Sequence, residues 1–281
     1  MPDEAQNRLG ALGELMAADV DASPYLADVA ASLDHAEVSV RQMAAALLGK
    51  IGAPAAAAVR PLCRCLTAPQ DELRAVAAFA LGRIGPAAVP ALRLMLQFSD
   101  PRAVAAAVSA LSQIGPEARE SLADLEGTAP RAPLAVQMAC AAAVARISGD
   151  ASRGLPVLLR ALDHPDPSVR KLSLEHITEL GPSAHPAIPR ILECAADPAP
   201  EVRAAGALTL GRIRAPASEV VSPMVRLLDD GSPEVRLNAM IVLASWGDAA
   251  SAALPALRKW SGDTDQKTSA AASAASKRIS A

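Results

Sequence analysis

The chain has 281 residues and a formal net charge of −3, and 51% of its residues are hydrophobic although only 2% are aromatic. A weakly acidic chain does not suit a protein built mainly to hold a polyanion, and an interior of Ala, Leu, Val and Ile favours helices over strands. No run of apolar residues approaches the length of a membrane span, and the polar first ten residues do not suit a secretory signal, so we expect a cytoplasmic protein.

The apolar residues repeat with a period of 33 residues, shortened once to 30. We call the residue that opens each repeat position zero; it is occupied by Val40, Leu73, Ala103, Val136, Val169, Val202 and Val235. Apolar residues then recur at three- and four-residue intervals over plus 0 to plus 11 and again over plus 19 to plus 26, which predicts two short amphipathic helices. Because neither helix can bury its apolar face alone, we predict an all-α solenoid of stacked helix pairs.

The N-terminal part of the chain contains a predicted capping unit and the first full repeat. Residues 1–33 are more polar and are predicted to form an N-terminal capping unit, followed by seven repeats over residues 34–261. In the repeat that opens at Val40, the first helix is expected to end at Gly52, because glycine tolerates the left-handed backbone found after helix C-termini. The same ending recurs as Gly85-Pro86, Gly115-Pro116 and Gly181-Pro182.

Two irregular repeats follow. Three residues are missing between Ile84 and Val89, so we expect a tighter turn there or a later start of the second helix. The segment 128–133, with the sequence TAPRAP, reads as a proline-broken linker. We therefore predict a local change in superhelical curvature over residues 85–133.

The C-terminal half returns to the regular period. Its turns, HPDPSVR, DPAPEVR and DGSPEVR, place Pro and Asp or Ser before a helix, where these residues fix φ or cap free N–H groups. Residues 262–281 fit a C-terminal capping helix with mostly Ala and Ser on its inward face. We predict that residues 1–281 form one continuous domain.

The recurrent pattern Val-Arg-x-x-Ala-Ala-x-Ala-Leu-Gly-x-Ile-Gly-Pro, best seen over residues 73–86, resembles HEAT-like repeats in the short form named after phycobilisome lyases. The resemblance covers nearly the whole chain and implies a right-handed superhelix of helical hairpins. Proteins with such repeats are mostly scaffolds that bind other proteins, while a few are phycobilin lyases, deoxyhypusine hydroxylases or DNA glycosylases. The resemblance is specific for the fold and not for the function.

An arginine follows position zero in most repeats, as Arg8, Arg41, Arg74, Arg170, Arg203 and Arg236. In similar repeats this arginine joins turn acids in a ladder that ties adjacent repeats together. The candidate acids in this chain are Asp34, Asp163, Asp197 and Asp229. Since a partly buried guanidinium has five N–H donors to satisfy, we interpret the arginines as structural, with a binding role as the alternative.

A second set of basic residues lies on the second helix of the repeats, at or beside plus 21 and plus 24, opposite the apolar face. Its members are Arg64, Arg93, Arg160, Arg190, Arg226, Arg258 and Lys259. We expect these helices to line the concave surface, where the basic strip would bind a partner protein with an acidic surface or peptide. The alternative is a solvated face without a partner.

Residues suited to catalysis do not form a recognised pattern. Among the histidines His35, His164, His176 and His185, only the reversed pair Glu175-His176 is similar to the repeated His-Glu ligand pairs of the hydroxylases. The cysteines Cys63, Cys65, Cys140 and Cys194 are expected to be packing residues rather than metal ligands, with Cys65 and Cys194 at flanking positions. There is no HExxH motif, phosphate loop or nucleophile elbow.

We therefore predict a non-enzymatic scaffold, without cofactor or metal, that binds another protein. One alternative is a chaperone-like subunit that presents a phycobilin to its acceptor protein. A nucleic-acid-binding protein is less well supported, because the aromatic residues are scattered and do not form a surface for stacking bases. These residues are Tyr25, Phe79, Phe98, Trp246 and Trp260.

Overall fold

The computed structural model describes residues 2–17 and 23–281, and every regular element in these residues is a helix. The predicted all-α solenoid fold is confirmed. The chain divides into two compact units, Met1–Asp150 (unit 1) and Ala151–Ala281 (unit 2). That the two units continue one another as a single domain stays a prediction.

Unit 1 alternates long and short helices. The long helices are α1 (Pro2–Ala17), α3 (Val38–Ile51), α5 (Asp71–Ile84), α7 (Pro101–Ile114) and α9 (Leu134–Ser148). The short helices are α2 (Leu26–Ala31), α4 (Val59–Cys65), α6 (Val89–Met95) and α8 (Leu122–Thr128). Short 3₁₀ segments connect them: η1 (Ser23–Tyr25), η2 (Ser32–Asp34), η3 (Ala53–Ala58), η4 (Gly85–Ala88), η5 (Gly115–Ser121) and η6 (Ala129–Arg131).

Unit 2 has the same alternation. Its short helices are α10 (Leu155–Ala161), α12 (Ile188–Cys194), α14 (Ala217–Leu227) and α16 (Leu254–Trp260). Its long helices are α11 (Pro167–Glu179), α13 (Pro200–Arg212), α15 (Pro233–Ser245) and α17 (Gln266–Ile279). The 3₁₀ segments are η7 (Ala151–Arg153), η8 (Gly181–Ala187) and η9 (Gly247–Ala253).

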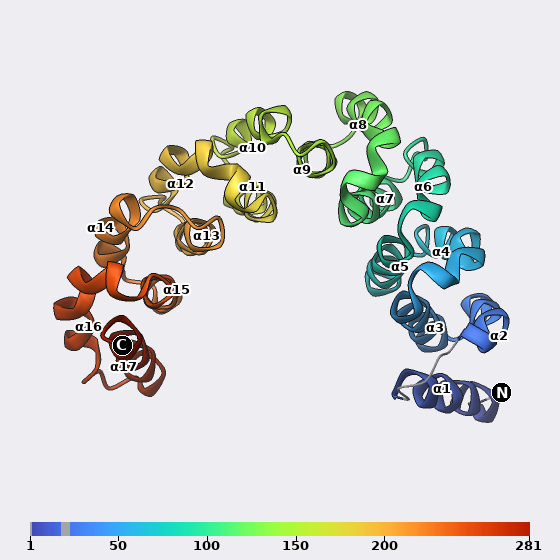
Figure 1. Ribbon diagram of the computed structural model, residues 1–281, viewed down its shortest axis with the longest axis horizontal. Helices are drawn as coiled ribbons and strands as arrows, with labels where there is room; N and C mark the ends of the chain where they lie inside the picture. The colour runs from blue at the N-terminus through green and yellow to red at the C-terminus, as the bar shows by residue number, and fades with distance from the viewer. Residues whose placement is uncertain (1, 18–22) are drawn as a thin grey trace. The chain divides into compact units, whose positions relative to one another are not determined.

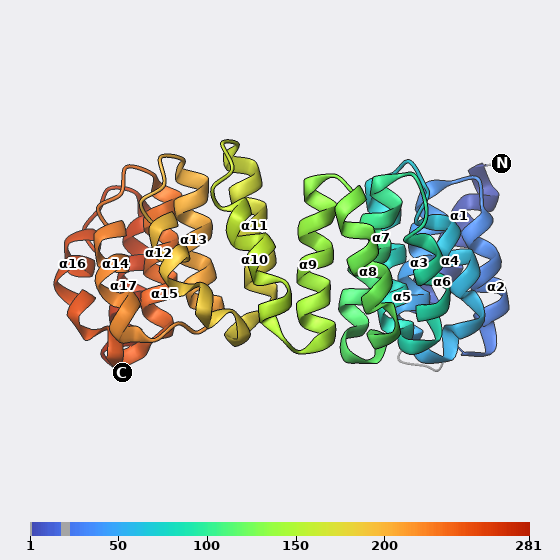
Figure 2. The ribbon, with the colours of Figure 1, turned by 90° about the horizontal axis from the view of Figure 1, so that it is seen from above.

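The helix hairpins begin half a repeat later than the sequence register suggests. Each short helix packs mainly against the long helix that follows it, as α4 does on α5 and α12 on α13. Successive long helices also pack against one another, whereas contacts between successive short helices are few. Each unit therefore has two layers, and within each unit the long helices lie on the inner side of the bend (Figures 1 and 2).

The predicted glycine stops are confirmed. Gly52, Gly85, Gly115 and Gly181 all have positive φ, between 58° and 82°, a conformation that a side chain disfavours. Each of them stands one or two residues after the end of a long helix, where the backbone turns into a 3₁₀ segment. In the repeat that opens at Val202 the same place is taken by Arg214, with a φ of 55°.

The irregular repeats of unit 1 differ from the others in the segments that connect their helices. Residues 85–88 join α5 to α6, whereas the longer segments 52–58 and 115–121 join the flanking pairs of helices. The missing residues therefore shorten the turn, as predicted, and α6 keeps the length of α4. The proline-broken segment 128–133 forms the end of α8 and the 3₁₀ segment η6. The change in curvature over 85–133 stays a prediction.

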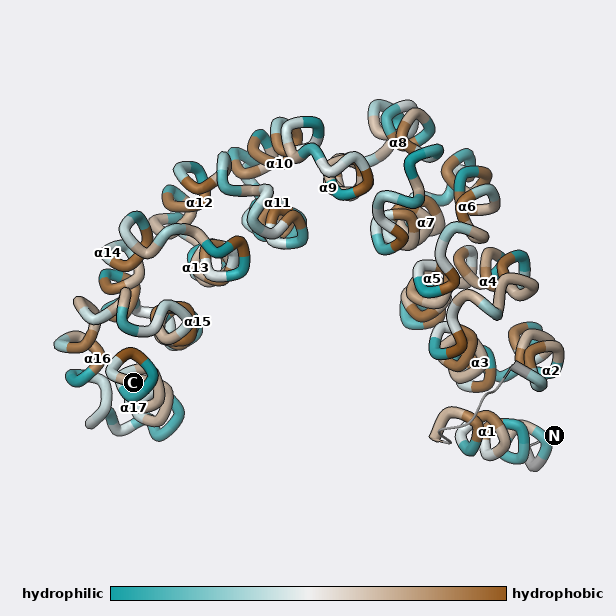
Figure 3. The backbone as a smooth tube through the Cα atoms, viewed as in Figure 1, coloured by the Kyte–Doolittle hydropathy of each residue, from teal (hydrophilic) through white to brown (hydrophobic). Residues whose placement is uncertain are grey.

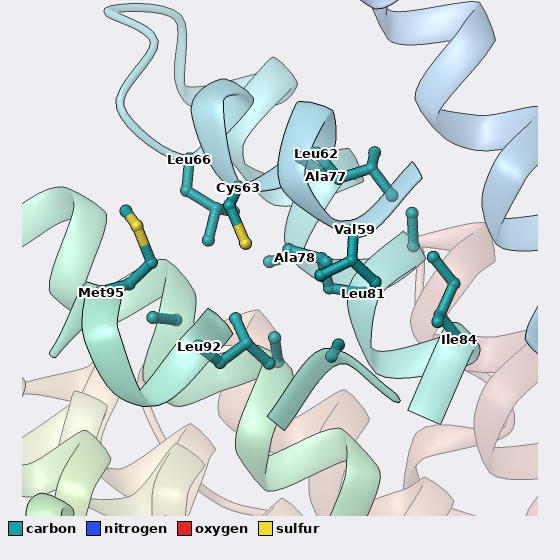
Figure 4. Packing of buried hydrophobic residues seen from close by; sticks show 14 of the residues in the cluster. Val59, Leu62, Cys63, Leu66, Ala77, Ala78, Leu81, Ile84, Leu92 and Met95 are labelled. Carbon is teal, nitrogen blue, oxygen red and sulfur yellow. The ribbon is translucent and has the colours of Figure 1, made fainter. Parts of the chain in front are cut away.

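The core of unit 1 is one continuous cluster of apolar side chains, from Leu12 on α1 to Ile147 on α9. Figure 4 shows part of it, where buried side chains of α4, α5 and α6, among them Leu62, Leu81 and Leu92, pack between the helices. Figure 3 shows hydrophobic and hydrophilic residues alternating around the helices, as expected for helices with one buried face. Burial of this face, rather than helix propensity, holds the layers together.

Glycines inside the long helices let these helices approach closely. A Cβ added at Gly49 of α3 would lie 3.2 Å from Ala80 Cα on α5. A Cβ at Gly82 would lie 2.8 Å from Gln113 Cβ, and one at Gly211 would lie 2.9 Å from a methyl group of Val242. All three glycines stand at plus 9. This explains the first glycine of the repeat pattern, and it draws the long helices together on the inner side.

By length and composition alone, the stretch Asp71–Met95 is apolar enough to cross a membrane. This corrects the expectation that no apolar run approaches such a length. The stretch is not a single helix, because α5 ends at Ile84 and α6 begins at Val89. Of its most apolar window, 44% is buried within unit 1, so its composition serves the core.

Candidate functional site

The predicted basic strip lies on the short helices. Its members are Arg64 on α4, Arg93 on α6, Arg160 on α10, Arg190 on α12, Arg226 on α14, and Arg258 and Lys259 on α16. In each unit these helices form the outer row, so the expectation that they line a concave surface is wrong. One physical reason is the glycine at plus 9 of three long helices, which lets the next long helix approach closely, whereas contacts between successive short helices are few.

Four bases of the strip are engaged by acids of neighbouring turns or short helices. Arg64 Nη2 lies 2.8 Å from Asp34 Oδ2, and Lys259 Nζ lies 2.9 Å from Asp229 Oδ1. The other ion pairs are Arg93 with Glu120 and Asp124, and Arg190 with Asp163 and Glu193. Among the described residues, Arg160, Arg226 and Arg258 have no ion-pair partner. The strip is therefore largely a set of links between neighbouring short helices.

The arginines after position zero form a separate system in unit 2. The guanidinium of Arg170 donates to both carboxylate oxygens of Asp197, at 2.8 and 2.7 Å. Arg203 does the same to Asp230, at 2.7 and 2.8 Å. Each arginine also donates to two backbone carbonyls of the turn before its own helix. The pairs tie one turn to the next with charge-assisted, bidentate hydrogen bonds.

These contacts shift the titration of both acids. Partial burial raises the pKa of Asp197, but hydrogen bonds from Arg170 and the Ala199 N–H, with the arginine charges, outweigh it and leave the pKa below its ordinary value. For Asp230, the hydrogen bond from Arg203 is the largest cause of a lowered pKa. Both carboxylates are therefore charged near neutral pH.

The other arginines of the set lack such a partner. Arg41 donates to the carbonyls of His35 and Ala36, and Arg8 to Ser32 Oγ and the Asp28 carbonyl. Arg74 pairs with Asp71 of its own helix and donates to the Ala68 carbonyl. Arg236 donates to the carbonyls of Asp230 and Gly231 and lies 4.8 Å from the ring centre of Trp260.

Three of the expected ladder acids belong instead to the outer row. Asp34, Asp163 and Asp229 stand six residues before position zero and bind bases of the short helices. Asp197 and Asp230 stand one residue later, at minus 5, and bind the arginines of the long helices. The position of an aspartate in the turn, minus 6 or minus 5, thus decides which base it binds, and this position can be read from the sequence.

The residue at minus 5 has a second role, which the sequence analysis missed. It accepts a hydrogen bond from the backbone N–H two residues later, through Nδ1 in His35 and His164 and through Oδ1 in Asp197, Asp230 and Asp263. The distances are 2.8 to 3.1 Å. Unit 1 has Ala68, Phe98 and Arg131 at this position, and none of these side chains can accept the bond.

Large apolar side chains are exposed on the inner row at one repeat position, plus 6. Phe79 on α5 is 50% exposed, Leu208 on α13 is 37% exposed and Ile241 on α15 is 58% exposed. Exposed arginines stand four residues later on two of these helices, as Arg83 and Arg212. We call these exposed positions of the long helices, taken within each unit, its long-helix face. Apolar contact area with basic side chains beside it is suited to binding a protein.

The cysteines and histidines serve packing and turns. All four cysteines are buried, so the flanking positions expected for Cys65 and Cys194 are wrong. The following long helix covers Cys194, since a Cβ at Gly206 of α13 would lie 3.3 Å from Cys194 Cβ. Burial raises the pKa of the Cys63, Cys140 and Cys194 thiols to about 11, which keeps them protonated. Among the described residues, no cluster of His, Cys, Asp and Glu suits a metal ion.

The model of HEAT repeats matches residues 59–145, 155–225 and 188–277 of this chain. No curated protein matches the sequence.

Solved structures show the same fold. A chain of a homology model of the AP-3 complex is 14% identical, with a TM-score of 0.66, and the match covers 99% of this chain and 55% of that one. A chain of the Kap95:Nup1 complex is 16% identical, with a TM-score of 0.58, and the match covers 96% of this chain and 43% of that one. This chain thus spans about half the length of these two neighbours.

A third neighbour has a similar length to this chain. It comes from the complex of CpcE and CpcF of phycocyanin lyase from Nostoc sp. PCC7120. The identity is 21% and the TM-score 0.50, and the match covers 83% of this chain and 94% of that one. At these identities the likeness concerns the fold alone.

Proposed function

Because the chain belongs to the HEAT-repeat family, we propose that it is a non-enzymatic scaffold that binds a protein partner through its long-helix face. The observation that carries the proposal is the exposure of Phe79, Leu208 and Ile241 at the same repeat position of the inner row. Because these side chains are 37–58% exposed, burying the rest of each in a complex would contribute about half of the roughly 1.5–3 kcal/mol expected for a fully exposed side chain. A surface held by packed helices also loses little entropy when a partner binds.

On α5 and α13 charge favours an acidic partner, whereas the same positions of α11 carry Glu175 and Glu179. Arg83 and Arg212 are exposed and stand one helical turn beyond Phe79 and Leu208 on the same helices. Basic side chains around an apolar patch steer an acidic surface and fix its orientation more than they add affinity. The proposed partner therefore presents apolar side chains bordered by Asp or Glu.

The structural neighbours support a protein partner in general terms. The AP-3 complex, the Kap95:Nup1 complex and the complex of CpcE and CpcF are all assemblies of several proteins. The three assemblies differ from one another, so they support the class of function and not a particular partner.

The proposal is tested by quantitative affinity capture from the source cells. The test variant carries Phe79→Asp and Ile241→Asp, two changes of exposed side chains that leave the core intact. The control variant carries Arg160→Glu and Arg226→Glu on the short helices. We expect the wild-type chain and the control to capture the same protein, and the test variant to capture at least about tenfold less of it. Equal capture by the test variant would exclude the long-helix face, and loss in the control alone would move the site to the short helices.

A second candidate is a subunit that holds a phycobilin for transfer to an acceptor protein. It is supported by the likeness in fold to the CpcE and CpcF complex alone. Mixing the purified chain with phycocyanobilin should then produce a shifted and narrowed visible absorption band. An unchanged spectrum at saturating chain concentration counts against this candidate.

A further inference from the structure

Two successive turns of unit 1 lack the ion pair that joins successive turns in unit 2. In unit 2, the arginine at plus 1 of one long helix binds the aspartate at minus 5 of the next turn, as in Arg170 with Asp197. The equivalent residues of α7 and of the turn before α9 are Val104 and Arg131. The arginine is replaced by an apolar residue and the acid by a base, so no ion pair joins these two turns.

A cavity lies where the two turns are left untied. It has a volume of about 250 Å³ and lies between the α6–α7 turn and the η6–α9 turn, entirely within unit 1. Its apolar walls include Phe98, Val104, Pro133 and Val136, and its polar walls include Thr128 and Arg131. Phe98 is 49% exposed, so the cavity opens to solvent. We call it the turn pocket.

Arg131 supplies an uncompensated positive charge to this pocket. Its Nε and Nη2 both donate to the Gly127 carbonyl, at 3.2 and 3.0 Å, which holds the guanidinium against the end of α8. Among the described residues, no acid pairs with it. The acid of the preceding turn, Asp100, is already bound by the side chain and the backbone N–H of Arg102. The guanidinium of Arg131 therefore has N–H donors left for a ligand.

We propose that the turn pocket binds a peptide segment of a partner protein that presents a carboxylate side chain next to an aromatic residue. The carboxylate would take the place of the missing turn acid and accept hydrogen bonds from Arg131. The aromatic ring would fill the space left by the missing arginine and pack on Phe98, Val104 and Val136. One aromatic side chain suits the size of the cavity, and it gains affinity chiefly by burying its apolar area.

This inference rests on the proposed function, because it describes part of the same partner. The pocket is lined by residues of the turns and of the helix ends beside them, and neither Phe79 nor Ile241 of the long-helix face is among them, so each site can be changed without the other.

The direct test uses three short peptides and the full chain labelled with ¹⁵N. The probe is acetyl-Gly-Phe-Asp-Gly-amide, and its controls replace Asp by Asn or Phe by Ala. We expect the probe to shift the amide resonances of residues 96–101 and 128–136, with a dissociation constant in the millimolar range for so small a ligand. Each control should bind at least about tenfold more weakly.

Variants place the binding in the turn pocket. Arg131→Gln should weaken the probe at least about tenfold, because it removes the charge and keeps a polar side chain. The double variant Val104→Arg with Arg131→Asp rebuilds the pair seen in unit 2, and it should close the pocket and abolish binding. Arg160→Gln, on α10 of unit 2, should change nothing.

Three outcomes overturn the inference: no shifts in the two turns, equal binding of the Asn peptide, or binding that survives the rebuilt pair. The variant with Phe79→Asp and Ile241→Asp separates the two proposals. If it loses the native partner but keeps the probe, both sites act as proposed. If it keeps the partner and the probe, the long-helix face is wrong and the turn pocket stands.

Discussion

The two units are built from one repeat but hold their turns together differently. In unit 2, Arg170 and Arg203 bind the aspartates of the next turns, and the residue at minus 5 caps its own turn. In unit 1, only His35 makes that capping bond among the minus 5 residues of the described turns, and the turns before α5, α7 and α9 carry Ala68, Phe98 and Arg131.

What the units share is the packing of the helices. Both place glycine at plus 9, as Gly49 and Gly82 in unit 1 and as Gly211 in unit 2, and both bury Leu at plus 8. Apolar packing therefore specifies the fold in both units. The ion pairs between plus 1 and minus 5 of successive repeats are an addition that unit 1 does without. A turn that has given up its ion pair is then available for binding.

The largest expected effect comes from breaking a turn pair of unit 2. In the pair of Arg203 and Asp230 the side chains are only 18% and 9% exposed, so Asp230→Ala leaves a nearly buried guanidinium without its acid. We expect a loss of about 3 kcal/mol in the free energy of unfolding of unit 2. Both tryptophans, Trp246 and Trp260, lie in unit 2, so urea unfolding followed by tryptophan fluorescence reports this unit alone.

The adjacent acid is the matched control. Asp229 pairs with Lys259 on the surface, where the two side chains are 61% and 69% exposed. Asp229→Ala should therefore cost no more than about 0.5 kcal/mol. A similar loss in both variants would mean that burial does not distinguish the two acids, and the comparison between the units would lose its basis.

The second prediction concerns what the units share. Gly82→Ala and Gly211→Ala place a Cβ 2.8 to 2.9 Å from the next long helix, so both should destabilise their units by about 1–2 kcal/mol despite the better helix propensity of Ala. Gly10→Ala in α1 is the control, since nothing lies within 4 Å of its added Cβ, and it should stabilise by up to about 1 kcal/mol.

Hydrogen exchange measured by mass spectrometry on the full chain gives the effect in each unit. A loss confined to one of the two glycine variants would show that close helix packing is not common to both units. Destabilisation by Gly10→Ala would show that helix propensity is not the favourable term in this comparison.

Much of the fold was legible in the sequence because one signal recurs in every repeat. The period of 33 residues, the glycine stops and the shortened third repeat all follow from local rules for helices and turns. The layer order did not follow. Both helices of a repeat are amphipathic, so the pattern does not say which row packs more closely, and the reason lies in contacts of Gly49 and Gly82 with the next repeat.

The candidate sites show the same limit. The sequence shows the basic residues of the short helices as a recurrent set, but not their partners, which stand in other repeats, as Asp34 does for Arg64. The turn pocket is different, because Val104 and Arg131 visibly break a recurrent pair of positions in the sequence. Such departures can be interpreted once the structure shows that the residues at plus 1 and at minus 5 of successive repeats are in contact.

The third prediction follows from the lowered pKa values of Asp197 and Asp230. A carboxylate whose pKa is lower in the folded state stabilises that state at pH values above its ordinary pKa of 3.8. This contribution is lost as the pH falls through the lower, folded value. Unit 2 should therefore lose stability below about pH 4, by less than Asp230→Ala costs, because a protonated carboxyl still accepts a hydrogen bond.

Urea unfolding followed by tryptophan fluorescence between pH 7 and pH 3 checks this. The Asp230→Ala variant has already lost one of the two acids, so its stability should fall less over the same interval. An equal fall in the wild-type chain and the variant would assign the acid sensitivity to other carboxylates of unit 2.

The smallest expected effect is a gain. Arg214 takes the place that glycine holds in five other repeats, at a φ of 55°. A side chain in this left-handed region costs roughly 1–2 kcal/mol, and the greater freedom of glycine in the unfolded chain takes back roughly 0.5–1 kcal/mol. Arg214→Gly should therefore stabilise unit 2 by about 0.5–1 kcal/mol, measured by urea unfolding.

The control for this gain is a glycine introduced at an ordinary helical position of the same unit. Arg226 is exposed near the end of α14 and has no ion-pair partner among the described residues, so Arg226→Gly should destabilise by up to about 1 kcal/mol. The opposite signs of the two changes would show that unit 2 tolerates a strained turn at Arg214 while its other turns are held by ion pairs. A loss of stability in both variants would mean that the contacts of the Arg214 side chain stabilise unit 2 by more than its backbone strain costs. Unit 2 would then be held together by Arg214 as well as by Arg170 and Arg203.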